Sequence, residues 1–198
     1  ENWELFARRE DLHPIIQTAV LHAQFEMIHP FLDGNGRMGR LLITLFLASK
    51  KILHTPCLYI SAYLQRHRGA YYASLAKISK NNDWNTWISF FLRAVVEHSK
   101  ANASLLMKMT DLYEISKTQF AEATNSSLAM ELLDYLFAQP IFTVPNLINQ
   151  TKVKASKATL LLAVQKLEKA GLVTKISEGR GRRPTVWKFG ALVDLIQD

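Results

Sequence analysis

Apolar residues recur at helical spacing through the first two thirds of the chain. Pro14 is typical of a first helical turn, and the helix that follows should end near His29-Pro30, because the residue before a proline avoids the helical region. The segment 38–49 is apolar on nearly every face, which predicts a buried central helix. The same periodicity predicts helices over about 69–79 and from Trp84 towards Ala123, with 53–64 as a connection.

The pattern changes after the polar segment 124–127, which is the best linker candidate in the chain. Helical spacing then predicts elements at 128–138, 143–149 and 156–170, and β-rich segments at 172–176 and 185–189 flank a turn rich in glycine and arginine. This order is typical of a winged helix-turn-helix. We therefore expect a mainly α fold with two domains, an all-helical core over 1–124 and a small α+β domain over 125–198.

The composition is that of an ordinary globular protein, with 198 residues of which 48% are hydrophobic and 21% charged. No run of eighteen apolar residues occurs, so we expect no membrane partner. The single cysteine, Cys57, excludes a disulfide within the chain and suits a reducing compartment. We expect a cytoplasmic protein.

Positive charge is concentrated at the end of the chain. Residues 1–139 carry 14 Lys/Arg against 13 Asp/Glu, whereas residues 140–198 carry 10 against 4. Such asymmetry favours a second module with an acidic partner, for which nucleic acid is the usual candidate. A basic surface that serves solubility alone is the alternative.

The stretch HPFLDGNGRMGR, residues 29–40, contains the dinucleotide-binding pattern G-x-G-x-x-G. That pattern requires a preceding strand, a βαβ unit and an acid about twenty residues further on. The preceding segment here is helical and no such acid follows. A P-loop is excluded as well, because no G-K-[ST] follows the glycines.

The same twelve residues contain the parts of a phosphate site. Gly34, Asn35 and Gly36 lie between two predicted helices, where backbone N–H groups and the N-terminus of the next helix favour an anion. Arg37 and Arg40 are three apart and share a helix face, and arginine grips phosphate in a bidentate fork. Asp33 is a candidate Mg²⁺ ligand, and His29 a candidate base for a hydroxyl.

Other interpretations exist for single residues. Phe31 is expected to be a core residue that anchors the loop. His22, Glu26 and His29 have the spacing i, i+4, i+7, so they are also candidates for a zinc hydrolase site, although no established zinc signature has that order.

Residues 29–40 match the motif HPFx[D/E]GNGRxxR of the Fic family at every specified position. The chain also resembles bacterial Fic proteins in HAQFEMIHPF, RLLITLFL, RHRGAYYASL and WNTWISFFLRAV, so the resemblance covers about residues 10 to 100. A Fic core followed by a winged helix is similar to a known bacterial architecture.

The resemblance implies an enzyme that transfers AMP from ATP to the hydroxyl of a Ser, Thr or Tyr in a protein target, with the chain itself among the candidates. It implies that His29 is the general base and Asp33 the Mg²⁺ ligand. It implies that Gly34, Asn35 and Gly36 cradle the phosphates, while Arg37 and Arg40 hold the β- and γ-phosphates. Tyr72 and, more weakly, Gln24 are further candidates for the nucleotide pocket.

Two alternatives remain open from the sequence. One is a DNA-binding regulator with a vestigial enzyme core, in which 156–170 is the recognition helix and the wing arginines are Arg180, Arg182 and Arg183. The C-terminal domain is equally a candidate for contact with a second subunit. The other alternative is a Fic-type enzyme that transfers UMP or phosphate, or removes AMP. The intact Gly34-Asn35-Gly36 turn favours AMP transfer.

Overall fold

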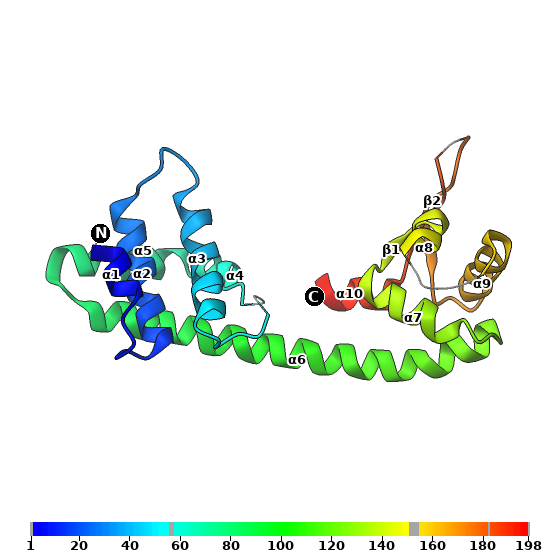
Figure 1. Cartoon of the computed structure of the whole chain (residues 1–198), viewed down its shortest axis with the longest axis horizontal. Helices are drawn as coiled ribbons and strands as arrows, with labels where there is room; N and C mark the ends of the chain where they lie inside the picture. Colours follow the sequence, from blue (N-terminus) through cyan, green and yellow to red (C-terminus); the bar gives the residue numbers. More distant parts are fainter. Residues whose placement is uncertain (1, 56–57, 151–154, 182, 198) are drawn as a thin grey trace. The chain divides into compact units, whose positions relative to one another are not determined.

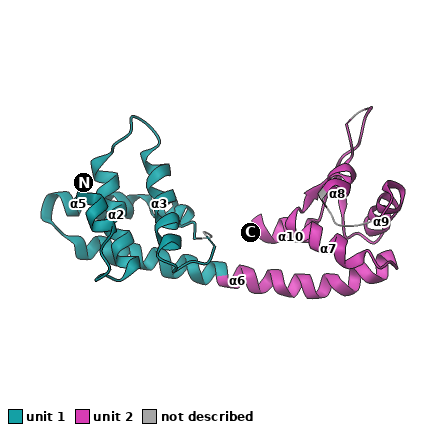
Figure 2. Cartoon of the chain, in the orientation of Figure 1, with its two compact units in different colours: residues 1–102 teal, residues 103–198 magenta. Residues whose placement is uncertain are grey.

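The computed structural model describes residues 2–55, 58–150, 155–181 and 183–197. They belong to two compact units, unit 1 over Glu1–Asn102 and unit 2 over Ala103–Asp198 (Figure 2). Each unit has its own core of buried side chains. The boundary between the units lies within one long helix, and the division into domains at residues 124 and 125 stays a prediction.

The chain is mainly helical, as predicted, and a small sheet lies in unit 2 (Figure 1). None of the helices in the described residues is long and apolar enough to span a membrane. The elements are α1 (Asn2–Ala7), α2 (Pro14–Ile28), α3 (Asn35–Ser49), α4 (Ser61–Arg66), α5 (Arg68–Asn81), α6 (Trp84–Thr124), α7 (Ala129–Ala138), β1 (Ile141–Phe142), α8 (Val144–Gln150), α9 (Lys157–Lys169), β2 (Thr174–Ser177), β3 (Val186–Lys188) and α10 (Gly190–Gln197).

Local chemistry sets both ends of α2. The ring of His13 accepts a hydrogen bond from the backbone N–H of Ile15, and Pro14 occupies the first helical position. The helix ends at Ile28, and its C-cap residue His29 has a left-handed backbone and directly precedes Pro30. The predicted helix that ends near the His29-Pro30 pair is therefore confirmed, and its end brings His29 to the loop that leads to α3.

The expectation that 38–49 is buried on every face is wrong. In α3, Gly39, Ile43 and Leu47 are buried, but Leu41 and Leu45 are 46% and 48% exposed. The physical reason is that α3 packs mainly against α2, which covers only one side of it. Apolar residues on the other side widened the apparent face of the helix in the sequence.

The short elements α1, α4 and β1 were not predicted, because none of them is long enough to show periodicity. The segment 53–64, expected to be a connection, already contains the start of α4 at Ser61. Strand β1 has two residues and exists through its antiparallel pairing with β3, in which Phe142 faces Trp187. Strand β2 pairs with the other edge of β3, so the order in the sheet is β1-β3-β2.

The predicted helices of unit 2 are confirmed near their expected bounds. Ser156 caps α9 by accepting a hydrogen bond of 3.1 Å from the N–H of Thr159. Gly171, with φ +75°, takes the left-handed conformation that ends this helix. Helix α6 contributes the fully buried Phe120 to the core of unit 2.

Candidate active site

His29 follows the last residue of α2 and has a backbone conformation that residues other than glycine rarely adopt. Its φ and ψ are 50° and 56°, in the left-handed region, and its backbone N–H still bonds to the carbonyl of Phe25. Such strain persists only where the surroundings impose it, and it is frequent at functional positions.

The exposed ring of His29 has one defined neighbour. Its Nδ1 lies 3.4 Å from the backbone carbonyl of Glu26. A carbonyl only accepts, so this contact favours the tautomer with the proton on Nδ1. The lone pair on Nε2 then remains available to a hydroxyl group from solvent or a partner.

Asn35 organises the loop between α2 and α3. Its side-chain oxygen accepts from the N–H of Phe31 at 2.9 Å, and its amide nitrogen donates to the carbonyl of Phe31 at 2.6 Å. Asn35 is 2% exposed, so its side-chain ends of these two hydrogen bonds are shielded from water. The expectation that Phe31 anchors the loop as a core residue is wrong, because its side chain is 49% exposed and the anchor is its backbone.

The N-terminus of α3 faces the loop with uncapped backbone donors. Gly34, at φ 82°, is the N-cap residue and has no side chain to bond them. The first N–H groups of a helix that lack such a partner form an anion site together with the helix dipole. Asn35 and Gly36 are the first two residues of that helix.

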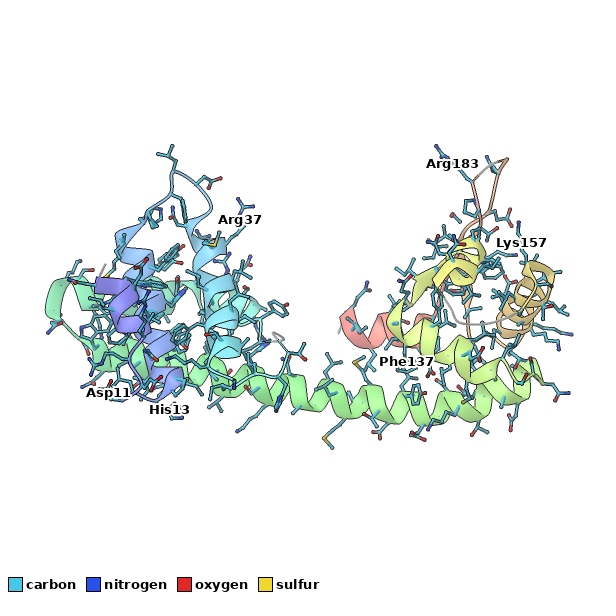
Figure 3. All side chains as sticks on the ribbon, in the orientation of Figure 1. Asp11, His13, Arg37, Phe137, Lys157 and Arg183 are labelled. Carbon is cyan, nitrogen blue, oxygen red and sulfur yellow. The ribbon has the colours of Figure 1, made fainter. Side chains whose placement is uncertain are left out.

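Asp33 and Arg37 are both exposed and lie close together. One oxygen of Asp33 accepts from the N–H of Gly34 at 2.6 Å, and the other lies 3.7 Å from the Arg37 guanidinium. Arg37 extends outward from the start of α3 (Figure 3). Asp33, Gly34 and Arg37 line a cavity of about 390 Å³ together with Phe31, Met38 and Leu41.

Arg40 borders a different cavity, of about 230 Å³, between α3, α4 and α5. Tyr71 and Tyr72 also line it, so Tyr72 lies beside Arg40 although 32 positions separate them in the sequence. The Arg68 guanidinium lies 5.6 Å from the centre of the Tyr72 ring. Arg68 also lines this cavity, together with Ser61, Leu64 and Gln65.

Five of the candidate residues therefore line two different cavities, whereas His29, Asn35 and Gly36 line neither of them. Asp33, Gly34 and Arg37 line one cavity, while Arg40 and Tyr72 line the other. Gln24 is half-buried in α2 and lines neither of these cavities.

A buried cluster beneath the site was missed by the sequence analysis. His22 is 2% exposed, and its ring contacts the carbonyl of Gly39 and the hydroxyl of Tyr71. Burial lowers the pKa of His22 to about 4, so the ring is neutral at neutral pH. Its Nε2 lies 4.0 Å from a carboxylate oxygen of Glu26, which with a neutral ring is no ion pair.

The zinc alternative gains no support from this geometry. His22 and Glu26 lie on one face of α2, but His29 leaves the helix with a left-handed backbone. Within the described residues, no group of three or more His, Cys, Asp or Glu side chains is arranged to hold a metal ion.

Comparison with known proteins points in one direction. Residues 1–47 match the model of the Fic/DOC family. A probable protein adenylyltransferase of Aquifex aeolicus is 36% identical over 74 residues, which is 35% of this chain and 22% of that protein. Protein adenylyltransferase Fic of Nematostella vectensis is 30% identical over 125 residues, which is 63% of this chain and 27% of that protein. The chain thus spans about a quarter of the length of these relatives.

The fold has a counterpart among solved structures. A Fic family protein from Desulfovibrio desulfuricans G20 aligns with a TM-score of 0.51 at 21% identity, covering 95% of this chain and 53% of that one. At this identity the likeness concerns the fold.

Proposed function

Because residues 1–47 match the model of the Fic/DOC family and the relatives reported above are named protein adenylyltransferases, we propose that the protein transfers AMP from ATP to a hydroxyl side chain of a protein target. The observation that carries the proposal is the loop from His29 to Arg40. It combines an exposed imidazole at the end of one helix with uncapped N–H groups and two arginines at the start of the next. Relatives named protein adenylyltransferase support the choice of ATP and of a protein target.

In the proposed reaction, Nε2 of His29 takes the proton of the target hydroxyl. The freed oxygen attacks the α-phosphorus of ATP, the bond from that phosphorus to the bridging oxygen breaks, and pyrophosphate leaves with the bond's electrons. The N-terminus of α3, with Gly34, Asn35 and Gly36, stabilises the phosphate charge, and Arg37 and Arg40 hold the β- and γ-phosphates. No covalent enzyme intermediate is needed, so positioning supplies most of the rate enhancement.

Asp33 is the proposed ligand of Mg²⁺. Its carboxylate is exposed beside the N-terminus of α3, and one or two carboxylates plus substrate phosphates are the usual ligands of this ion in nucleotide sites. A bound Mg²⁺ neutralises developing phosphate charge. The ion pair with Arg37 is exposed and long, so it is easily exchanged for these partners.

The cavity beside Arg40 is the proposed site for the rest of the nucleotide. Tyr72 and Arg68 both line it, so an aromatic ring and a planar guanidinium are each available there for a base to stack on. Gln24 remains a weaker candidate.

The test uses Mg-ATP labelled at either the α- or the γ-phosphate, incubated with the full chain and candidate targets or alone. Label on protein from the α position only is the expected result. Label from the γ position only indicates phosphate transfer and contradicts the proposal. UTP in place of ATP examines UMP transfer, and a pre-labelled target examines removal of AMP.

Basic residues of unit 2 favour a second candidate function, binding of DNA through a winged helix over residues 125–198. Arg180 and Arg183 pair through their backbones in the β2–β3 turn, and Arg183 projects from it (Figure 3). Arg182 lies outside the described residues. Exposed Leu161 and Leu162 on α9 favour instead contact with a second subunit. A salt-dependent duplex-binding assay on the chain and its R180A/R183A variant separates the two partners.

A further inference from the structure

The interior of unit 1 contains one histidine whose two ring nitrogens both have partners on other helices. His22 projects from α2, with Nδ1 at 3.1 Å from the carbonyl of Gly39 in α3 and Nε2 at 3.1 Å from the hydroxyl of Tyr71 in α5. Its ring also stacks on Trp87 of α6, with centroids 5.9 Å apart and an interplanar angle of 19°. A single buried side chain therefore connects three helices by hydrogen bonds and a fourth by stacking.

The chemistry of these partners fixes the tautomer of His22. The carbonyl of Gly39 only accepts, so the proton lies on Nδ1, and Nε2 must accept the proton of the Tyr71 hydroxyl. The ring is neutral at neutral pH, so each nitrogen has one defined role. Both ring nitrogens of His22 are therefore satisfied, in an interior where an unsatisfied nitrogen would be costly.

The two partners of His22 lie next to the proposed nucleotide site. Gly39 directly precedes Arg40, and Tyr71 lines the same cavity as Arg40. The contact is close because Gly39 has no side chain: an added Cβ would overlap Glu26 Oε1 and approach His22 Cε1 to 3.3 Å. The bond from Nδ1 therefore joins α2 to the backbone of α3 at the residue before Arg40.

We propose that His22 is a positioning residue of the nucleotide site, which holds the Gly39 backbone and thereby the Arg40 guanidinium at the cavity that Tyr71 lines. This inference rests on the proposed function. His22 does not contact the nucleotide in this role, and its effect on the reaction is transmitted by the backbone of α3.

Two substitutions of His22 distinguish the effects of its two side-chain hydrogen bonds. In His22→Asn, the amide nitrogen is attached to Cγ, as Nδ1 is, so it retains the donor to Gly39 and loses the acceptor for Tyr71. In His22→Gln, the amide is one bond further out, as Nε2 is, so it retains the acceptor and loses the donor to Gly39. Each variant loses one hydrogen bond and the stacked ring, so both should lower Tm by similar amounts.

The two variants should nevertheless differ in their use of ATP. We expect His22→Gln to raise the KM for Mg-ATP roughly tenfold relative to His22→Asn, with kcat changed less, because an arginine that binds phosphate is displaced. The kcat value is normalised to the folded fraction measured by circular dichroism, whereas KM is independent of the amount of active enzyme. Equal KM values, or a larger KM for His22→Asn, overturn the inference, because a merely structural histidine affects both variants alike.

A measurement on the unmodified chain keeps the inference testable even if neither variant folds. Long-range ¹H–¹⁵N NMR spectra report which ring nitrogen of His22 carries the proton. We expect the Nδ1–H tautomer, and a shift of the Nδ1 signal when Mg-ATP is added. An Nε2–H tautomer overturns the inference, and so does a chemical shift of Nδ1 that stays unchanged at saturating Mg-ATP. Absence of both ATP binding and AMP transfer in the unmodified chain refutes the proposed function instead, and the tautomer is read independently of it.

Discussion

At the scale of single residues, His29 and Arg37 have separate tasks in the proposed reaction. His29 presents a ring nitrogen to the incoming hydroxyl, whereas Arg37 projects from the start of α3 beside Asp33. Neither side chain supports the core, since both are exposed. Substitutions at these positions should therefore change function with little effect on folding, apart from strain at the left-handed backbone of His29.

We predict that His29→Ala lowers AMP transfer by about 10²-fold or more, the usual contribution of a general base, while ATP affinity stays within about twofold. Arg37→Ala should weaken ATP binding roughly tenfold, because a charge-assisted bond to phosphate is lost. Transfer is followed with α-labelled ATP and affinity by isothermal titration calorimetry. A loss of ATP affinity in His29→Ala as large as that in Arg37→Ala would contradict this division of tasks.

At the scale of elements, the packing of α2 on α3 determines where the loop between them lies. The two helices approach closely at Gly39, whose Cα faces Phe25, Glu26 and His22 of α2. Oε1 of Glu26 is buried there without a hydrogen-bond partner among the described residues, and burial raises the pKa of this carboxyl group. The contact leaves no room for a methyl group.

We predict that Gly39→Ala destabilises the protein by about 1–3 kcal/mol, the usual cost of overpacking, despite the higher helix propensity of alanine. An added Cβ would lie 3.2 Å from Cδ1 of Phe25 and would displace the Glu26 carboxylate. Gly69→Ala in α5 is the matched control, because a Cβ there meets no atom within 4 Å. Urea unfolding measures both. A stability of Gly39→Ala equal to or above that of Gly69→Ala would show that the helices are less tightly packed.

Much of this element structure was predictable from sequence, and the exceptions have physical causes. Helical spacing of apolar residues over a long segment predicted a helix from Trp84 towards Ala123, and the observed helix α6 ends at Thr124. The motif correctly predicted a loop between two helices, but α3 already begins at Asn35, so of the expected turn only Gly34 lies outside the helix. In contrast, β1 depends on its distant partner β3, and the contact of His22 with Tyr71 joins residues 49 positions apart. No local spacing rule reports such pairs.

At the scale of the whole molecule, α6 serves two cores. Trp87 and Phe91, near its start, are fully buried in unit 1, and Phe120, near its end, is fully buried in unit 2. Met109, Leu112 and Tyr113 are also packed against the core of unit 2. A cut at the linker predicted from sequence would separate these side chains from the rest of unit 2.

We predict that a fragment of residues 103–198 unfolds cooperatively, whereas one of residues 125–198 is strongly destabilised. Removal of a buried phenylalanine alone costs about 3–5 kcal/mol, a large part of the about 5–15 kcal/mol that stabilises a typical domain. Phe120→Ala in the longer fragment isolates the contribution of that ring. Urea titrations monitored by circular dichroism compare the three. Equal stability of the two fragments would support a domain boundary at residue 125.

The left-handed backbone at His29 also determines which substitution is best suited to make an inactive variant of the protein. Alanine disfavours this conformation, whereas asparagine visits it more readily than most residues. His29→Asn would therefore leave the loop in place while removing the imidazole. This variant would bind ATP and its target but would not transfer AMP between them. Such a stalled assembly would make the protein a bait for identifying the target that it modifies.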